Sequence, residues 1–357
     1  MANIAREVIW PPDADIVVRV VFLHVGQGES AIVLISDSGT YRALLIDINL
    51  DGERGGIDVP RLMSALLEDE DGRLGAFVNT HPHGDHLSGI LELSDAVRID
   101  EVWHSGHKPG RKHSDHYGNL QEVIGRVRDA GGSEVKLKGS RTPTVIGEAE
   151  CYVLAPAEYV VDDIEGESDD DRERRVHEQC AVLKFGIGSK WIMVTGDAER
   201  DAWEKHITEY HRERLQAVVL DAPHHGSRTF FHYDETDEPY LDALKAISPT
   251  YVVISAPRSD ESEWGHPHDD AVERYVEVVG SNDNVLHTGE KRHSFICDIY
   301  RDGQYAVQSD GGDLVHEYGI EGEDDGEKEH GRTTPAVVGT RVDERPMGRL
   351  TAWTSLG

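Results

Sequence analysis

The run Thr80-His81-Pro82-His83-Gly84-Asp85-His86 constrains this chain more than any other segment. It packs three imidazoles and a carboxylate, which are donors that hold Zn²⁺ or Mn²⁺, into six positions. An apolar strand-like stretch precedes the run and a helix-like one follows it, which predicts a tight loop at a strand end. The spacing predicts two pairs of ligands, His81 and His83 for one metal and Asp85 and His86 for another. A histidine-rich surface turn is the alternative interpretation.

The same run resembles the metal-binding signature His-x-His-x-Asp-His of the metallo-β-lactamase superfamily. Five further segments resemble, in order and spacing, the branch typified by the soluble domain of the bacterial competence DNA-uptake channel protein. They are Phe22-Leu23-His24-Val25-Gly26-Gln27-Gly28-Glu29-Ser30, Leu45-Ile46-Asp47, Thr195-Gly196-Asp197, Ala222-Pro223-His224-His225-Gly226-Ser227 and Gly265-His266-Pro267. The resemblance implies a binuclear metal-dependent hydrolase, and it spans most of the chain.

Alternating strand-like and helix-like segments predict an α+β fold. The β-rich segments 16–25, 30–35 and 41–48, separated by glycine-containing turns, predict an opening antiparallel meander. Later strands are expected at 150–154, 181–185, 190–194, 217–220 and 250–255, and helices at 60–68, 120–130, 199–214 and 269–279. Helices covering two sheets give an αββα sandwich of the metallo-β-lactamase type, and the resemblance implies that the metals lie at one edge between the sheets. We expect one domain over residues 1–318 and an acidic, disordered tail over 319–357.

The resemblance also implies the remaining ligands. Asp197, which follows an apolar segment, would bridge the two metals, and Asp47 would orient the metal loop. Adjacent residues at a strand end point opposite ways, so only one of His224 and His225 is expected to bind metal directly. The resemblance favours His224 as that ligand, with His225 contacting the ligands. The third ligand of the first metal stays open, because His177 would supply it or would be a solvated residue that ends an acidic loop.

Two divalent cations, Zn²⁺ or Mn²⁺, that share a carboxylate supply hydroxide at neutral pH and stabilise charge on a substrate oxygen, which predicts hydrolysis. The carboxylate of Asp197 stands where β-lactam hydrolases of the superfamily place a cysteine, and it favours phosphoesters or thioesters. Asp85 and His266 are the predicted catalytic residues, and His266 would protonate a leaving alkoxide or clamp a phosphate. A phosphodiesterase or nuclease is the first interpretation. The alternatives are a thioester or lactone hydrolase, and a metal-binding component of a multi-protein defence or toxin system.

The segment 104–117 combines glycine and proline with basic residues in a chain that is otherwise acidic. A loop of this composition would overhang the metals and bind phosphate, or it would be an ordinary surface loop. The predicted phosphate contacts are Lys108, Arg111, Lys112, Ser227 and Arg228.

The formal net charge of −32, from 68 acidic and 36 basic residues, opposes the binding of long polyanions. A nucleotide or a short nucleic acid is therefore favoured over long duplex DNA. The same excess of acid fits a chain that must stay soluble in high salt. Three cysteines without metal-like spacing, and no segment with the character of an export signal or membrane span, predict a cytoplasmic protein without a membrane partner. The apolar residues 350–356 would dock on a protein partner or a second subunit.

Overall fold

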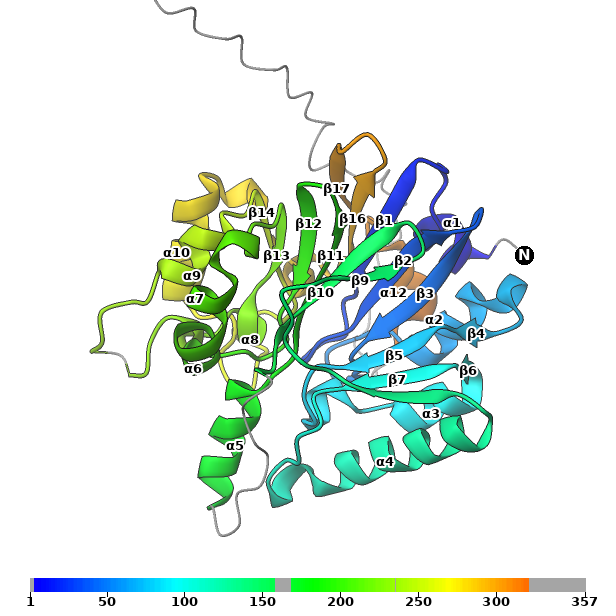
Figure 1. Ribbon diagram of the computed structural model, residues 1–357, viewed down its shortest axis with the longest axis horizontal. Helices are drawn as coiled ribbons and strands as arrows, with labels where there is room; N and C mark the ends of the chain where they lie inside the picture. Colours follow the sequence, from blue (N-terminus) through cyan, green and yellow to red (C-terminus); the bar gives the residue numbers. More distant parts are fainter. Residues whose placement is uncertain (1–2, 158–167, 235, 321–357) are drawn as a thin grey trace, which may run out of the picture.

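Two β-sheets lie face to face in the computed structural model, which describes residues 3–157, 168–234 and 236–320 (Figure 1). Within these ranges the first sheet has the order β17 (Tyr305–Ser309), β16 (Phe295–Tyr300), β1 (Ile16–Phe22), β2 (Ala31–Asp37), β3 (Thr40–Ile46), β5 (Ala76–Asn79), β7 (Glu101–His104) and β8 (Ser133–Lys136). The second has the order β15 (Val285–His287), β14 (Tyr251–Ile254), β13 (Val219–Asp221), β12 (Lys190–Val194), β11 (Val182–Ile187), β10 (Ala149–Ala155) and β9 (Thr144–Ile146). The strands β4 (Arg73–Leu74) and β6 (Arg98–Ile99) form a small separate pair.

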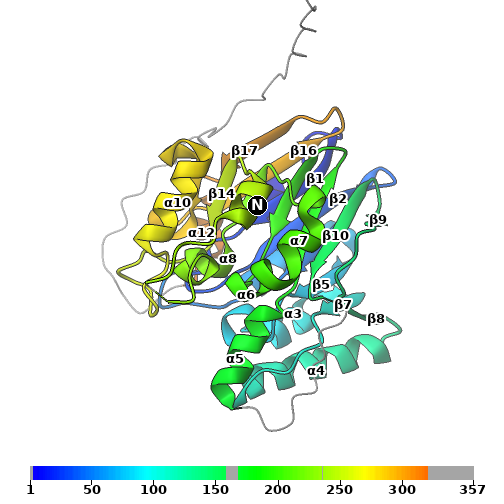
Figure 2. The same cartoon turned by 60° about the vertical axis from the view of Figure 1, so that its left-hand side comes forward.

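Helices cover the outer face of each sheet, and this layering persists when the molecule is turned (Figure 2). Those beside the first sheet are α1 (Ile4–Ile9), α2 (Val59–Leu66), α3 (Ile90–Ala96), α4 (Ser114–Asp129) and α12 (Asp313–Tyr318). Those beside the second are α6 (Arg200–Ala202), α7 (Thr208–His211), α9 (Asp242–Ile247) and α10 (Asp269–Val279). The helices near the site or in connections are α5 (Asp169–Glu178), α8 (Pro223–Gly226) and α11 (Thr288–Lys291). The predicted αββα sandwich is confirmed.

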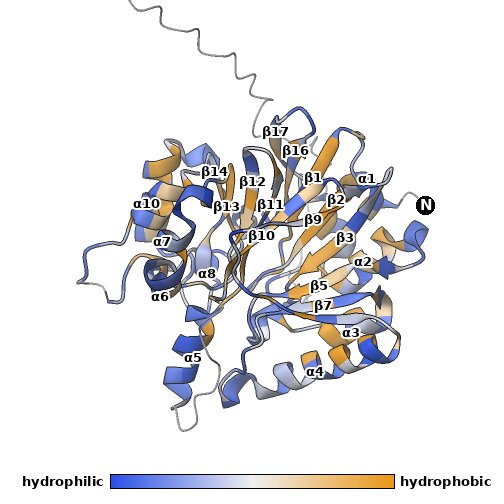
Figure 3. Cartoon of the chain, in the orientation of Figure 1, coloured by the Kyte–Doolittle hydropathy of each residue, from blue (hydrophilic) through white to orange (hydrophobic). Residues whose placement is uncertain are grey.

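Side-chain alternation along the strands explains why both faces of each sheet are buried. In β1, Val20 and Phe22 pack between the sheets, whereas Val21 packs toward the helices. In β12, Ile192 lies between the sheets and Met193 lies under the helices of the second layer. Apolar strands therefore fill the centre of the molecule, and hydrophilic segments gather outside it (Figure 3).

The direction of the strands brings several chain segments to one edge of the sandwich. The predicted opening meander is confirmed, because β1, β2 and β3 pair antiparallel. From β3 onward the first sheet continues with parallel pairing through β5, β7 and β8. In the second sheet β12, β13 and β14 are also parallel. Parallel strands end at the same edge, so the segments that follow β3, β5, β12 and β13 meet there.

Three expectations from the sequence need adjustment. Helix α4 begins at Ser114, six residues before the predicted start. The acidic segment 162–171 is expected as a solvated loop, but its residues from Asp169 onward begin helix α5. The predicted tail begins at Gly319, but Gly319 pairs with Ile57 and the Ile320 amide donates to the Gly56 carbonyl. The rest of the tail, including 350–356, lies outside the described residues. No helix in the described ranges has the length and apolarity needed to cross a bilayer.

Candidate metal centre

The histidine run forms a tight loop directly after β5, as its sequence predicts, and residues Gly84–His86 make one 3-10 turn before α3. Asp47 follows β3 and holds this loop from behind. Its Oδ1 accepts hydrogen bonds from the Thr80 amide at 2.8 Å and the Asn79 side chain at 3.0 Å, and its Oδ2 lies 2.7 Å from His86 Nδ1. Asp47 is fully buried. These contacts are those expected of a residue that orients the loop.

A first group of donor atoms combines His81, His83, His177 and Asp197 within 4.8 Å of one another. His177 Nε2 lies 3.2 Å from His83 Nδ1, and Asp197 Oδ2 lies 3.5 Å from His81 Nε2. His177 reaches this position from the last turn of α5. His177 is mostly buried and lies in a helix and not at the end of a loop, and its role as a metal ligand stays a prediction.

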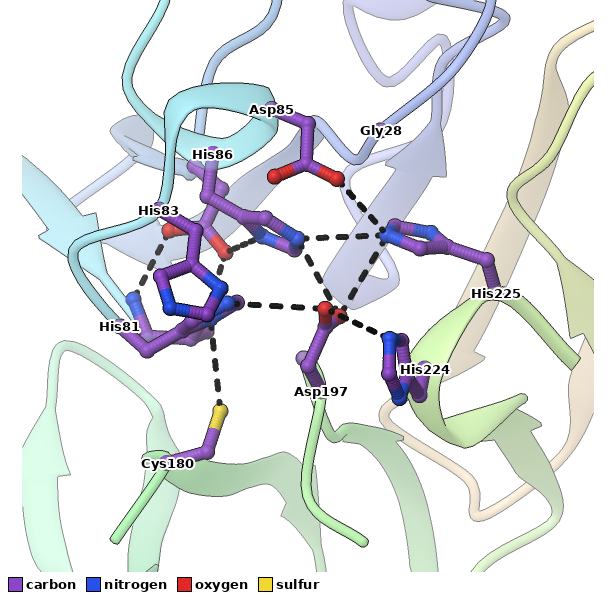
Figure 4. A network of polar contacts seen from close by, with 12 residues as sticks. Gly28, His81, His83, Asp85, His86, Cys180, Asp197, His224 and His225 are labelled. Carbon is purple, nitrogen blue, oxygen red and sulfur yellow. Dashed lines mark hydrogen bonds and ion pairs between the residues drawn. The ribbon is translucent and has the colours of Figure 1, made fainter. Parts of the chain in front are cut away.

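A second group combines Asp85, His86, His225 and again Asp197 (Figure 4). Asp197 Oδ1 lies 3.2 Å from His86 Nε2 and 3.4 Å from His225 Nε2. His225 Nε2 also lies 3.6 Å from Asp85 Oδ2. The two oxygens of Asp197 therefore face different donor groups, which is the geometry of a bridging carboxylate.

The candidate histidines share one feature, which is that one ring nitrogen contacts the surrounding protein while the other faces the donor group. Such outer contacts fix the ring orientation and the tautomer of metal ligands. The contacts are His86 Nδ1 with Asp47 at 2.7 Å, His83 Nε2 with Glu173 at 2.6 Å, His177 Nδ1 with Glu199 at 3.1 Å, His225 Nδ1 with the Ser255 carbonyl at 2.8 Å, and His81 Nδ1 with Thr80 Oγ1 at 3.2 Å. The remaining nitrogen of each ring is aimed where a cation would lie.

Two buried atoms show that these residues fit divalent cations. His81 Nε2 and Asp197 Oδ1 make no hydrogen bond to any described residue, although unpaired buried polar atoms are costly. Burial holds the pKa of His81 well below its usual value, so the imidazole is neutral and able to bind metal. Burial opposes ionisation of Asp197, but His224, His86 and His225 outweigh it and hold its pKa well below the usual range. Neutral imidazoles and ionised carboxylates are the forms that bind divalent cations.

The structure brings both His224 and His225 into groups of donor atoms, so the choice of His224 as the metal ligand stays a prediction. Both residues lie in a left-handed turn, with φ values of 51° and 56°, and not at a strand end. The alternation of side chains along a strand therefore does not apply, and both rings point toward Asp197 (Figure 4). His225 joins Asp85 and His86, whereas His224 Nε2 lies 3.4 Å from Asp197 Oδ2 and its Nδ1 lies 3.0 Å from Glu199.

His266 lies beside this turn, with its ring centroid 5.1 Å from that of His224 and 6.2 Å from that of His225. Its side chain is buried, and burial together with the neighbouring His224 and His225 lowers its pKa to about 3. The imidazole is therefore neutral at pH 7. A neutral ring suits the predicted role of a hydrogen-bond donor to phosphate better than that of a strong acid.

The predicted phosphate-binding segment is only partly a loop. Residues 105–110 connect β7 to a 3-10 turn at Arg111–His113, and 114–117 are the first turn of α4. His104 is buried against Glu134 at 2.9 Å and does not face the metal centre as a substrate contact. Lys108, Arg111 and Lys112 are exposed.

The remaining predicted phosphate contacts follow the left-handed turn. Ser227 is buried, and its hydroxyl oxygen accepts from the Thr229 amide, so it begins the next turn. The guanidinium of Arg228 lies 3.4 Å from Asp270.

Three residues of the site are absent from the sequence-based prediction: Glu173, Glu199 and His113. Glu199 follows Asp197 by two positions, and that spacing was the available signal. Glu173 follows the acidic segment 162–171, and only its helical periodicity with His177 would have shown a shared face. The His113 ring stacks on that of His83 at 4.2 Å, and its Nδ1 accepts from the Gly84 amide. That contact joins residues 30 positions apart in the sequence, so no pattern among neighbouring residues predicts it.

No protein-family model and no curated protein matches the sequence. Among solved structures, Igni18, a metallo hydrolase from the hyperthermophilic archaeon Ignicoccus hospitalis KIN4/I, is similar at 14% identity over 75% of this chain and 94% of that one, with a TM-score of 0.43. Unliganded yeast PDE1 is similar at 10% identity over 76% and 97%, with a TM-score of 0.45, and a diphosphatase from the PhnP family at 12% over 75% and 94%, with a TM-score of 0.35. Further matches are named as metallo-β-lactamases or members of that superfamily. These likenesses are distant, and the assignment of the fold rests on the layers and strand order described above.

Proposed function

We propose that this chain is a binuclear metal-dependent hydrolase of the metallo-β-lactamase superfamily that cleaves phosphodiesters. The observation that carries the proposal is Asp197, whose two oxygens face two separate groups of imidazoles and carboxylate. The first site would comprise His81, His83, His177 and Asp197, and the second Asp85, His86, His225 and Asp197. The order of the sequence motifs supports the branch typified by the competence channel domain.

Two divalent ions held there would supply a Lewis acid and an activated water, the chemistry of hydrolysis at neutral pH. Both donor groups consist of nitrogen and oxygen atoms, which suit zinc or manganese. Cys180 lies 3.7 Å from the outer nitrogen of His81, and its thiol belongs to neither group. Burial raises the pKa of that thiol well above its usual value, so it remains protonated.

The residues around the ions favour a phosphoryl substrate. His266 and His224 lie side by side and present imidazoles to the Asp197 side of the centre, where they can donate hydrogen bonds to the oxygens of a phosphodiester. Lys112 and Arg228 supply positive charge nearby. The net charge of −32 opposes a long polyanion, so a nucleotide or a short nucleic acid is the proposed substrate class. The three free, buried cysteines support a reducing compartment, and we propose the cytoplasm.

Elemental analysis of the purified protein, run beside hydrolysis of bis-p-nitrophenyl phosphate and of labelled single- and double-stranded DNA, tests the proposal. We expect about two Zn or Mn per chain in the wild type. Asp85→Ala should lose one ion and abolish cleavage. Asp95→Ala is the matched control, because Asp95 is an exposed acid on α3 that pairs with Arg126. Full metal occupancy without phosphodiester cleavage in any salt or metal would refute the proposed substrate class and point to thioesters or lactones.

A further inference from the structure

An exposed tryptophan stands at the edge of the candidate metal centre. Trp264 is 54% exposed, and it lies two residues before His266. The other large hydrophobic side chains exposed among the described residues are Val145, Tyr210 and Tyr233. Tyr210 contacts Arg141 and Tyr233 contacts Arg200, whereas Trp264 belongs to the segment that carries His266, whose ring lies beside His224. A large apolar ring left open to water at such a position suggests a binding surface.

The segment that carries Trp264 is held firmly although its ring is exposed. The Ser262 hydroxyl accepts from the Trp264 amide at 3.3 Å and from the His266 amide at 3.0 Å, and it donates to Gln27 Oε1 at 2.9 Å. Arg54 Nε donates to the Glu261 carbonyl at 2.8 Å. These contacts tie the segment to the glycine turn after β1 and to the connection between β3 and α2, so the position of the Trp264 segment is set by the body of the protein.

The ammonium group of Lys112, which belongs to a different segment of the chain, lies over the same ring. Lys112 Nζ is 4.9 Å from the ring centroid of Trp264, a cation–π distance. The neighbour of Lys112 is His113, whose ring stacks on the metal-loop histidine His83 at 4.2 Å. The contact between Lys112 and Trp264 therefore joins the segment of His113, which stacks on His83, to the segment of His266, which lies beside His224.

We propose that Trp264 and Lys112 recognise the nucleoside part of the substrate, with a nucleobase stacked on the indole and the Lys112 ammonium paired with the adjacent phosphate. This inference rests on the proposed phosphodiesterase function and names its substrate class. Stacking on an aromatic side chain needs no particular base, because every base has a π-face. The site should therefore select for the presence of a base and tolerate its identity. A single such stack is worth about a fivefold to a 150-fold increase in affinity.

Binding is measured in the Asp85→Ala background so that no ligand is cleaved. The ligands are a 5′-phosphorylated deoxyadenosine dinucleotide and a dinucleotide of identical backbone that lacks both bases, each titrated by calorimetry. We expect the parent protein to bind the base-bearing ligand at least about fivefold more tightly. Trp264→Ala should bring this ratio to near one, and Trp264→Phe should restore part of it. Lys112→Ala should weaken both ligands and leave the ratio unchanged.

Tyr210→Ala is the matched control, because Tyr210 is an exposed aromatic on α7 that carries Arg141 over its ring at 4.1 Å. It should leave the ratio at the parent value. A ratio that Trp264→Ala does not change would overturn the inference. If the wild type cleaves bis-p-nitrophenyl phosphate but binds both dinucleotides equally, the inference fails while the proposed function stands. If it cleaves no phosphodiester and neither ligand binds, both fail.

Discussion

At the scale of single side chains, the candidate metal centre depends most on the carboxylates that contact its histidines on the side away from the donor groups. Asp47, Glu173 and Glu199 each contact the outer ring nitrogen of a histidine in the donor groups. Glu199 is unusual because its Oε1 lies 3.1 Å from His177 Nδ1 and 3.0 Å from His224 Nδ1. One carboxylate oxygen therefore aims two imidazoles toward Asp197.

Replacing Glu199 by Gln should weaken metal binding at the first site about 10- to 100-fold, because the amide cannot accept from both rings as a charged acceptor does. Competition with a chromophoric chelator measures the two dissociation constants separately. Glu204→Gln is the control, because Glu204 is an exposed acid nearby that pairs with Arg200 at 2.8 Å. Equal affinities in Glu199→Gln and the wild type would show that Glu199 does not position the ligands.

The carboxyl pair of Glu29 and Asp221 makes the free energy of unfolding depend on pH. Both carboxyls are buried. Burial and the neighbouring charge of Asp221 raise the pKa of Glu29 well above its usual value, and burial raises the pKa of Asp221 to about 7. The folded chain therefore retains protons that the unfolded chain loses near pH 4, so the pair contributes stability that is lost as pH rises toward 7 and beyond.

Urea unfolding of the chelator-treated protein at pH 5.5 and pH 8 tests this expectation. The wild type should lose more stability between the two values than Glu29→Gln, in which the pair no longer carries two ionisable groups. The comparison between the two proteins cancels the histidines common to both. An equal loss of stability in the wild type and in Glu29→Gln, or a larger loss in the variant, would contradict the assignment of raised pKa values to this pair.

At the scale of secondary structure elements, one buried ion pair joins three of them. Arg19 on β1 makes two hydrogen bonds to Asp298 on β16, at 2.7 and 2.8 Å, and a third to the Ile9 carbonyl at the end of α1. Both charged side chains are almost fully buried. Arg19 points outward from the first sheet at the position where its neighbours Val18 and Val20 point inward, so the pair ties the edge of the helix layer to the sheet.

Asp298→Asn should lower the free energy of unfolding by about 3 to 5 kcal/mol, because it leaves the Arg19 charge buried without a counter-ion. Urea or thermal unfolding measures the loss. The exposed pair of Arg126 and Asp95, also 2.8 Å apart, is the control, and Asp95→Asn should change the midpoint very little. A small effect at Asp298 would mean that water or a rearranged side chain solvates Arg19.

At the scale of the whole molecule, the large negative net charge is a property that the fold does not explain. With 68 acidic residues against 36 basic ones, like charges repel across the surface at low ionic strength. Salt shortens the range of this repulsion from about 10 Å at 0.1 M to about 3 Å at 1 M. Added salt should therefore stabilise the folded chain relative to the unfolded one, as the hypothesis of salt adaptation requires.

Raising KCl from 0.1 to 2 M should raise the midpoint of thermal unfolding and preserve phosphodiesterase activity. Differential scanning calorimetry and turnover of bis-p-nitrophenyl phosphate over the same salt series measure both. Folding and activity that are best in dilute buffer and lost in molar KCl would rule out salt adaptation. Sodium sulfate at equal ionic strength separates screening from effects of the particular ions.

The local sequence by itself determined the elements and the ligand types of this protein. The nearly continuous apolar runs of β1 and β12 and the glycine turns of the opening meander are set by residues adjacent in the chain, as is the loop that holds His81 to His86. These features depend on contacts between near neighbours, and a single sequence displays such contacts. The αββα class followed from the order of those elements.

Only the tertiary structure decided which residues complete each donor group. His177 lies beside His83 because residues from Asp169 onward form α5, and His225 lies beside Asp85 and His86 because two consecutive histidines adopt a left-handed turn. The contacts of Glu173 with His83, and of Lys112 with Trp264, join residues far apart in sequence. Such contacts depend on how helices and loops are placed over the sheet edge, and chain spacing does not encode that placement.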